Sequence, residues 1–523
     1  MKLNELTIKE AQEGLRKKDF SSTELLQACL QRIKEVDGRL NAFITVCEKE
    51  ALKEAEKTDG VIARNPNAFN LQPLLGIPIA AKDNFCVKGV RTTAGSKILE
   101  NYFPPYDATV IARLKKAGAI ILGKTNMDAW AHGSSTETSQ FFTTKNPWNT
   151  DFLPGGSSGG SAAAIAADET IGAIGSETAG SIRQPAAWCG VVGFKPTYGR
   201  VSRYGLIAMA SSLDSPGPMT KTIEDAALIL SVLSGNDKMD ATTSSCPGYE
   251  YPKISGKNIS GLKIGVPREY FFKEMDKKTA NVVFKAIEIL KKKGARLKEI
   301  TMFDPKYAIA VYTILQRSEV SSNLARYDGI RYGKNRSFFG EEAKRRIMLG
   351  THTLSAGYYD AYYLKAQKVR NLICRDFERV FKDVDILVAP TSPNTALKIG
   401  ASINDPLFGE LQDVLVEPST LAGLPGVNLP CGFIDGLPVG MQIIGPQFRE
   451  DMLFEAGFAY EQEAQWYKMK PPLAKPVVSF ISSAKSAEAP PFSRQWRDSG
   501  GPPLHSSMDK ARGFLRRRIK PKI

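Results

Sequence analysis

The chain has 523 residues, of which 42% are hydrophobic, so it can bury a large core in one big domain with appended pieces. No apolar run is long enough to span a membrane and the N-terminus lacks the apolar centre of a signal peptide, so we expect a soluble, cytoplasmic protein. The net charge is +15, but residues 471–523 hold 11 Lys and Arg against 3 Asp and Glu, so the remaining chain has only a modest attraction for RNA.

Seven cysteines are scattered along the chain without a CxxC pair. This pattern predicts neither a disulfide framework nor a zinc cluster, so we expect reduced, mostly buried thiols and no metal in this chain. Cys86 and Cys189 lie near the candidate site described below, and for both we favour a packing role over a nucleophilic one.

Residues 1–70 are predicted to form an N-terminal helical region. Ser21 begins a capping box, and apolar residues recur at helical spacing from Leu26 to Ile33. A second helix is expected over 45–57. We favour this amphipathic pair as a cover for the core over a partner-binding surface.

From residue 74 onward, apolar runs typical of strands alternate with helical patterns, which predicts an α/β fold with helices on both faces of a sheet. The expected strands are 74–82, 119–124, 170–175, 263–266, 385–388, 427–430 and 439–444. The expected helices are 108–116, 158–167, 223–234, 277–293, 358–382 and 450–465.

The stretch LPGGSSGGSAAAIAADETIGAIGSETAGSIR, residues 153–183, joins two glycine-serine turns through an alanine-rich helix, with Ser157 in the first turn and Ser181 in the second. Glycines let the backbone approach a substrate closely, and free N–H groups at a helix start can hold an anion. No Lys-Ser or Lys-Thr pair follows, which disfavours a nucleotide phosphate. A transient oxyanion beside a serine nucleophile fits better, and a plain flexible loop is the remaining alternative.

A serine nucleophile needs a neighbouring base. Among the three histidines only His132 precedes the serine loop in a motif, and no acidic orienting partner accompanies it, so a Ser-His-Asp triad is disfavoured. Lys82 ends the apolar run 74–81, and a buried lysine can act in its neutral form. The alternative for Lys82 is a structural salt bridge with Asp83.

The segments LLGIPIAAKDNF, GGSSGGSAAA and GSETAGSIRQPAAWCGVVGFKPTYGRVSRYG resemble the amidase signature family, whose catalytic apparatus is Ser-Ser-Lys. The resemblance implies the amidase-signature fold, with a large mixed β-sheet covered by helices on both faces. It also implies that Ser181 is the nucleophile, that Ser157 is a bridging serine on a cis peptide bond, and that Lys82 is the base. The residues expected to supply the oxyanion N–H groups are Thr178, Ala179 and Gly180.

Further segments are similar to one branch of that family, the glutamine-hydrolysing subunits of heterotrimeric tRNA-dependent amidotransferases: TNMDAWAHGSSTETS, SSNLARYDGIRYG, KRRIMLG, GYYDAYYLKAQKVR and LAGLPGVNLPCG. The branch implies that Arg346 holds the glutamine α-carboxylate, that Asp413 holds its ammonium and that Tyr312 lines the pocket. These roles suit a planar guanidinium and a carboxylate. The expected partners are GatB-like and GatC-like subunits, with misacylated tRNA, ATP and Mg bound mainly by the partners and no cofactor in this chain.

The resemblance implies a glutaminase that supplies ammonia for the transamidation of misacylated Glu-tRNA(Gln), Asp-tRNA(Asn) or both. A stand-alone amidase acting on another small or fatty amide is the first alternative. An inactive scaffold subunit is the second, because Glu177 and Ala179 stand where the family usually has aspartate and glycine.

The catalytic domain is expected to span 71–475. Within it, residues 256–382 are richer in charge and long helices, so a helical lid-like subdomain is expected there. Paired tyrosines in 358–363 have the spacing of one helix face, and we favour packing on the core over stacking on nucleotides. Residues 476–523 resemble nothing in the family and are expected to form a disordered basic tail.

Overall fold

The computed structural model describes residues 2–65, 67–250, 259–330, 333–403, 405 and 407–473. Within these residues the strands are β1 (Phe43–Val46), β2 (Pro78–Lys82), β3 (Ile120–Thr125), β4 (Gly172–Glu177), β5 (Val192–Lys195), β6 (Ser215–Thr220), β7 (Lys263–Pro267), β8 (Arg296–Ile300), β9 (Ile386–Pro390), β10 (Gly426–Ile434) and β11 (Leu437–Ile444). The helices are α1 (Ile8–Lys17), α2 (Ser22–Leu40), α3 (Glu48–Arg64), α4 (Ala68–Leu71), α5 (Thr109–Lys116), α6 (Gly159–Ala166), α7 (Arg183–Cys189), α8 (Ile223–Leu233), α9 (Lys277–Lys292), α10 (Lys306–Leu324), α11 (Glu341–Leu354), α12 (Lys365–Val380), α13 (Phe408–Asp413), α14 (Glu417–Leu421) and α15 (Glu450–Ala464).

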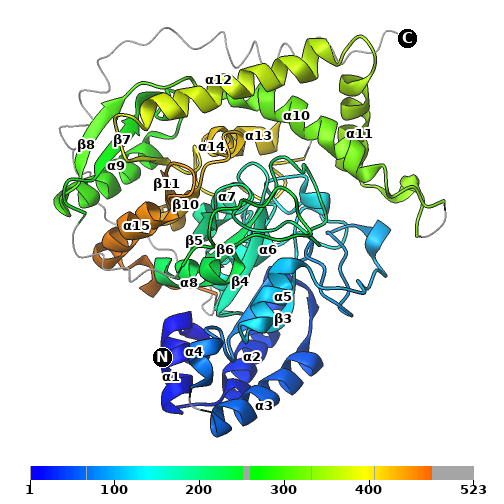
Figure 1. Cartoon of the computed structure of the whole chain (residues 1–523), viewed down its shortest axis with the longest axis vertical. Helices are drawn as coiled ribbons and strands as arrows, with labels where there is room; N and C mark the ends of the chain where they lie inside the picture. The colour runs from blue at the N-terminus through cyan, green and yellow to red at the C-terminus, as the bar shows by residue number, and fades with distance from the viewer. Residues whose placement is uncertain are drawn as a thin grey trace.

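One large sheet passes through the molecule in the order β1-β3-β2-β4-β6-β5-β10-β11-β9-β7-β8 (Figure 1). Strands β3, β2 and β4 are parallel neighbours, as are β9, β7 and β8. The strands between these groups pair antiparallel, and so does β1 with β3. The predicted mixed α/β sheet is therefore confirmed.

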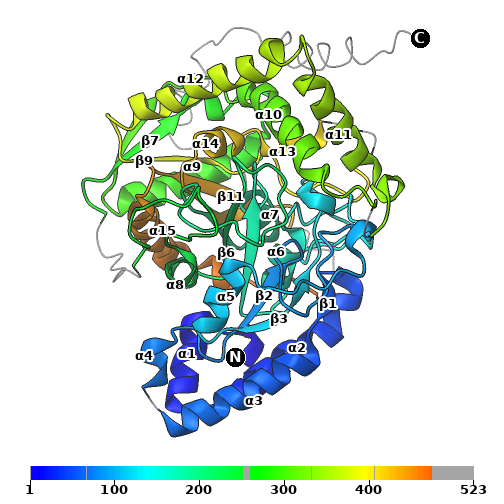
Figure 2. The ribbon, with the colours of Figure 1, turned by 45° about the vertical axis from the view of Figure 1, so that its right-hand side comes forward.

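Helices cover both faces of the central strands (Figures 1 and 2). On β4, a side chain at Gly172 would meet Ile229 of α8, whereas one at Gly175 would meet Ser158 and Ile182, next to α6 and α7. Because residues three apart on a strand point to opposite faces, α8 lies on one side of β4, and α6 and α7 lie on the other. The two serine turns are thus held against one face of the sheet.

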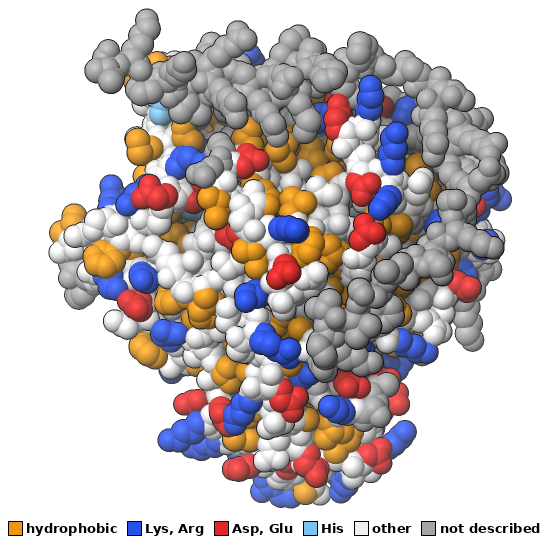
Figure 3. Space-filling view, turned by 180° about the vertical axis from the view of Figure 1, so that it is seen from behind, with side chains coloured by type: hydrophobic (Ala, Val, Ile, Leu, Met, Phe, Trp, Pro, Cys, Tyr) orange, Lys and Arg blue, Asp and Glu red, His pale blue; other side chains and the backbone are white. Residues whose placement is uncertain are grey.

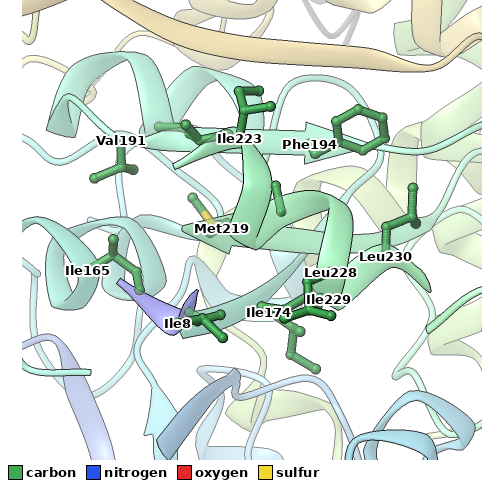
Figure 4. Close-up of a cluster of buried hydrophobic side chains, with 14 of the residues drawn as sticks. Ile8, Ile165, Ile174, Val191, Phe194, Met219, Ile223, Leu228, Ile229 and Leu230 are labelled. Atoms are coloured by element: carbon green, nitrogen blue, oxygen red, sulfur yellow. The ribbon is translucent and has the colours of Figure 1, made fainter. Parts of the chain in front are cut away.

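The main core cluster joins the strands to the covering helices. Figure 4 shows part of this cluster, with Met219 of β6 among side chains from α8 and from neighbouring strands. On the N-terminal helix α2, Leu26, Leu30 and Ile33 are buried in the same cluster, so this helix covers the core as favoured. No helix of the described residues is both long and apolar enough to cross a membrane.

The N-terminal region departs from its predicted helical character. The helix expected from residue 45 is wrong at its start, because β1 occupies Phe43–Val46 and α3 begins only at Glu48. Val46 pairs with Gly123 of β3, and the aromatic and β-branched residues of this segment favour a strand. Residues 1–70 therefore contribute an edge strand to the sheet.

Residues 256–382 also contribute more than helices. Strands β7 and β8 lie in this range and belong to the same sheet, while α10 packs against both α11 and α12 (Figure 1). The core-facing interpretation of the paired tyrosines is wrong for two of them, because Tyr358 and Tyr359 are exposed. A π-helical turn, Asp360–Leu364, precedes α12 and shifts which residues share a face. The expected tail, 476–523, lies outside the described residues.

Candidate active site

Lys82 is the last residue of β2, and its side chain is fully buried. Its ammonium donates hydrogen bonds to the hydroxyl of Ser157, at 2.7 Å, and to the carbonyl of Ser176, at 3.0 Å. Burial lowers the pKa of Lys82 to about 7, because the charged form loses its hydration. The neutral amine that a base requires is therefore accessible near physiological pH.

The alternative salt bridge between Lys82 and its neighbour Asp83 does not form. Asp83 accepts instead from the ammonium of Lys124, at 2.9 Å, and from the backbone N–H of Thr93, also at 2.9 Å. Successive residues of an extended segment point to opposite sides, so the side chains of Lys82, at the end of β2, and of Asp83 have different surroundings. The alternative of a structural salt bridge between Lys82 and Asp83 is therefore wrong, and the amine of Lys82 bonds to Ser157 instead.

Ser157 lies in the loop that leads into α6, and the peptide bond between Gly156 and Ser157 is cis, as the resemblance implies. The N–H of Gly156 donates to the side chain of Gln184, at 3.0 Å. Asp128 packs against Gly156 so closely that a side chain there would collide with its carboxylate. The position of Ser157 is therefore set by close packing as well as by the hydrogen bond from Lys82.

Ser181 stands between the end of β4 and the start of α7, and its backbone carbonyl accepts from the N–H of Ser158, at 3.1 Å. The two serine turns are thus in direct contact. The N–H groups of Ala179, Gly180 and Ser181 donate to no group among the described residues. Free N–H groups beside a serine can stabilise an oxyanion that forms next to that serine.

A buried ion pair holds the Ser181 turn in place. Glu177 accepts from the guanidinium of Arg183, at 2.6 and 2.9 Å, and from the backbone N–H groups of Ile182 and Arg183. The other Arg183 nitrogen donates to Ser419 and Gln442. The glutamate that replaces the usual aspartate therefore makes a complete set of bonds.

Ala179 and Thr178 complete the turn without obstructing it. The backbone of Ala179 does not adopt a positive φ, and its side chain packs in a buried cluster with Ala210 and Leu213. Thr178 donates from its hydroxyl to Asp214, at 2.6 Å. The methyl group that replaces a usual glycine hydrogen is therefore accommodated by the core.

A small cavity lies against Ser181 and brings together all three residues that were predicted to bind substrate. Tyr312 comes from α10, Arg346 from α11 and Asp413 from the end of α13. The lining residues are Ala131, Gly133, Ser134, Ser181, Met209, Tyr312, Arg346, Gly409, Glu410 and Asp413. Residues that are far apart in the sequence thus form one wall facing the serine.

The two charged residues predicted to bind substrate, Asp413 and Arg346, have different partners in this wall. Asp413 accepts from the hydroxyl of Ser134, at 2.8 Å, while its other carboxylate oxygen has no partner among the described residues. That free oxygen is directed at Gly180, where any side chain would collide with it. Burial raises the pKa of Asp413 well above its usual range, so a cation bound here would favour its charged form. The guanidinium of Arg346 is bound by Glu342 of the same helix, at 2.6 Å.

Sequence reasoning missed several residues of the wall. Arg317 and Glu410 form a buried ion pair at 2.9 Å, and Glu410 lines the cavity. Ser134 was present in a quoted motif without an assigned role, and its serine-rich loop was the available signal. The Arg317–Glu410 pair joins residues 93 positions apart, so no local pattern indicates it.

The rival catalytic groups are poorly placed. His132 is buried, and neither ring nitrogen has a hydrogen-bond partner among the described residues. Burial lowers its pKa well below its usual value, so its imidazole is neutral, and no carboxylate of the described chain orients it. Cys86 lines a different cavity of about 500 Å³ that contains none of the predicted site residues. Burial raises the pKa of the Cys86 thiol, which disfavours the nucleophilic thiolate.

Comparison with known proteins identifies close relatives of the chain. The family model for amidases matches residues 24–454. The A subunit of the glutamyl-tRNA(Gln) amidotransferase of Moorella thermoacetica is 50% identical over 487 residues, which cover 90% of this chain and 99% of the relative.

Solved structures agree with this result. The structure of the A subunit of the glutamyl-tRNA(Gln) amidotransferase of Thermotoga maritima has a TM-score of 0.75 and 42% identity, covering 88% of this chain and 95% of that one. The native peptide amidase of Stenotrophomonas maltophilia has a TM-score of 0.77 and 30% identity, covering 90% of this chain and 99% of that one. The same fold therefore occurs both in an amidotransferase subunit and in a peptide amidase.

Proposed function

This chain belongs to the amidase family, and from that premise we propose that it is the glutamine-hydrolysing subunit of a cytoplasmic tRNA-dependent amidotransferase. The identity to proteins of that name extends over almost their whole length. The observation that carries the catalytic part is the hydrogen bond between the buried amine of Lys82 and Ser157, beside the turn of Ser181.

Ser181 is the nucleophile. Its hydroxyl oxygen attacks the side-chain amide carbon of glutamine while its proton passes to Ser157, whose own proton passes to neutral Lys82. The N–H groups of the turn from Thr178 to Ser181 hold the oxyanion, and the hydroxyl of Thr178 fixes this turn through Asp214.

Collapse of this intermediate breaks the bond between carbon and nitrogen. The proton returns from Lys82 through Ser157 to the nitrogen, so ammonia leaves and a γ-glutamyl ester remains on Ser181. Water then attacks the ester by the same proton relay and releases glutamate. Every proton that Ser181 or water loses is accepted by Lys82, so no other base is needed.

The cavity wall selects an amino acid. Arg346 pairs with the α-carboxylate, Asp413 with the α-ammonium through its free oxygen, and Tyr312 lines the side-chain path. A simple amide has neither charge and would leave the free oxygen of Asp413 unpaired, which disfavours a stand-alone amidase for such substrates. The complete bonding of Glu177 and Arg183 likewise argues against an inactive scaffold.

The ammonia is used elsewhere. We propose that GatB-like and GatC-like subunits complete a heterotrimer, and that the partner binds ATP, Mg and the misacylated Glu-tRNA(Gln) or Asp-tRNA(Asn). In the described part of this chain, no group of three or more His, Cys, Asp or Glu side chains could hold a metal ion.

The test is a glutaminase assay on this chain alone and with co-expressed GatB-like and GatC-like subunits. We expect ammonia and glutamate in equal amounts, with transamidation only in the complex. Turnover of a peptide amide or a fatty amide in preference to glutamine would support the stand-alone amidase instead. Equal background rates for wild type and Ser181→Ala would support the scaffold.

A further inference from the structure

Helix α11 presents two different faces. Ala343, Arg346 and Gly350 point inward, and a side chain at Gly350 would collide with the backbone of Arg317 on α10. The opposite face carries exposed Met348. The inward face of α11 therefore packs on α10 and contributes Arg346 to the cavity wall, whereas the outer face is accessible to another molecule.

Large hydrophobic side chains are concentrated on α11, α12 and the turn between them. Five of the sixteen exposed large hydrophobic residues of the described chain lie within this short stretch: Met348 (72% exposed), Tyr358 (43%), Tyr359 (43%), Leu364 (37%) and Leu372 (61%). Figure 3, seen from behind, shows hydrophobic side chains among side chains of both charges on the upper part of the molecule. Concentrated apolar exposure of this kind marks interaction sites.

The tyrosines of this stretch are already ordered. Tyr358 stacks on Tyr362, with ring centroids 5.9 Å apart, and lies 4.2 Å from the ring of His352. Tyr359 stacks on Tyr363 at 5.2 Å. Rings held in this way lose little freedom on binding, so their contacts cost less entropy than those of mobile side chains.

Positive charges border the apolar residues. Lys365, Lys368 and Arg375 recur at helical spacing on α12, are exposed, and form no ion pair with the described residues. Asp360 is the only acidic residue from 343 to 375, and α11 and α12 carry four more at their outer ends: Glu341, Glu342, Asp376 and Glu378. The first three form ion pairs with a Lys or Arg of the same helix. The face defined by these cations and by the five exposed hydrophobic residues, called the α11–α12 face below, is therefore apolar with a basic rim.

We propose that the α11–α12 face docks an acidic amphipathic segment of a partner subunit. The inference rests on the proposed function, because it requires that the chain works in a complex. Charge complementarity identifies the partner, since a basic rim attracts carboxylates. Tyr358 and Tyr359 could stack on an RNA base, but Met348 and Leu372 are the most exposed of the five residues and offer no stacking surface, which favours a protein.

Two other occupants fit the charges less well. A second copy of the chain would bring one basic rim against another, which is repulsive. The C-terminal segment 474–523 is itself strongly basic, so the same repulsion opposes its binding here. An acidic partner removes this repulsion and covers the apolar residues at the same time.

The experiment measures the affinity of the full chain for the purified GatB-like and GatC-like subunits. The triple variant Lys365→Glu, Lys368→Glu and Arg375→Glu is expected to raise Kd about tenfold to a hundredfold, because three attractive charges become repulsive. A second variant, Tyr358→Ala with Leu372→Ser, tests the apolar part and is expected to raise Kd about tenfold.

A matched control reverses three exposed lysines on α9: Lys277→Glu, Lys285→Glu and Lys292→Glu. The net charge changes equally, so Kd should stay within about twofold of the wild-type value if the effect is local. All variants alter exposed side chains, and an unchanged thermal midpoint shows that each one is folded.

Unchanged affinity in both face variants, or equal loss in the control, would overturn the inference while leaving the proposed function in place. Failure of wild type both to bind the two subunits and to release ammonia from glutamine would overturn the proposed function and the inference together.

Face variants that still bind the subunits but lose affinity for a tRNA would assign the face to RNA. A wild-type dimer that the triple variant abolishes would assign it to a second copy.

Discussion

The two sides of the active site differ in how their polar groups are bonded. On the sheet side, the amine of Lys82 donates a hydrogen bond to Ser157, and Glu177 and Arg183 form a hydrogen-bonded ion pair. On the helical side, one carboxylate oxygen of Asp413 faces the cavity and has no partner among the described residues. The side chains of Glu417 and Gln316, which do not line the cavity, also lack partners there.

This difference separates catalysis from recognition. A buried polar group without a partner costs about 1–3 kcal/mol, so the helical side is the part of the site that a polar ligand would stabilise. The sheet side is already arranged for proton transfer and changes little when substrate binds. Substitutions on the sheet side should therefore lower kcat, and those on the helical side should raise KM.

Replacement of the nucleophile is expected to have the largest effect. Ser181→Ala should lower the kcat for glutamine by about 10⁴-fold or more, because the acyl-enzyme cannot form. The control is Ser158→Ala, which removes a neighbouring hydroxyl that donates only to the carbonyl of Ser176. Steady-state ammonia release measures both. A loss of similar size in the two variants would assign the effect to disruption of the serine turns.

The pH profile tests the sheet side through Lys82. The pKa of this residue is lowered to about 7 and the base must be neutral, so kcat/KM should fall about tenfold per pH unit below pH 7 and level off above it. Lys195 provides the control, because burial also lowers its pKa to about 7 but its ammonium donates to the carbonyl of Pro196. The acidic limb should persist in Lys195→Met. Loss of the acidic limb in Lys195→Met would show that the titrating group is Lys195 and not Lys82.

The helical side is tested by Arg346→Ala. The loss of a charged carboxylate contact should raise the KM for glutamine about 10- to 100-fold with a smaller change in kcat. Arg345→Ala is a close control, since Arg345 is partly exposed and pairs with the same Glu342. An unchanged KM in Arg346→Ala would exclude this arginine from carboxylate binding.

The smallest effect is expected at Ala179. Ala179→Gly should change the glutaminase rate by less than about threefold, because the methyl group packs in the core and not in the cavity. The lost packing and the added backbone freedom should lower stability by about 1 kcal/mol, measured by denaturant unfolding. A large gain in rate would show that the methyl group obstructs the oxyanion turn.

The sequence predicts the sheet side better than the helical side. Lys82, Ser157 and Ser181 stand in short motifs whose glycines, alanines and apolar runs indicate local structure, and the structure places Lys82 and Ser157 in contact. Arg346 and Asp413 carry no local signal, and only the family resemblance singled them out. Their convergence depends on how three helices pack, which no short pattern encodes.

Other differences have local physical causes. Strand β6, with the sequence SPGPMT, contains two prolines and a glycine, which disguise a strand, yet it lies in the centre of the sheet. The exposed tyrosines were misplaced because a spacing of four suits one face of an α-helix, whereas the π-helical turn Asp360–Leu364 alters that register. Because Tyr358 and Tyr359 are exposed and do not pack on the core, they form part of the α11–α12 face.

The central claim is that Ser181 carries the γ-glutamyl group. The most direct measurement is rapid acid quenching of wild type during turnover of glutamine, followed by mass spectrometry of its peptides. A γ-glutamyl ester on the peptide that contains Ser181, absent from Ser181→Ala, is the result expected. Ammonia release without such an ester, or an ester on Ser157 or Cys86, would contradict the account.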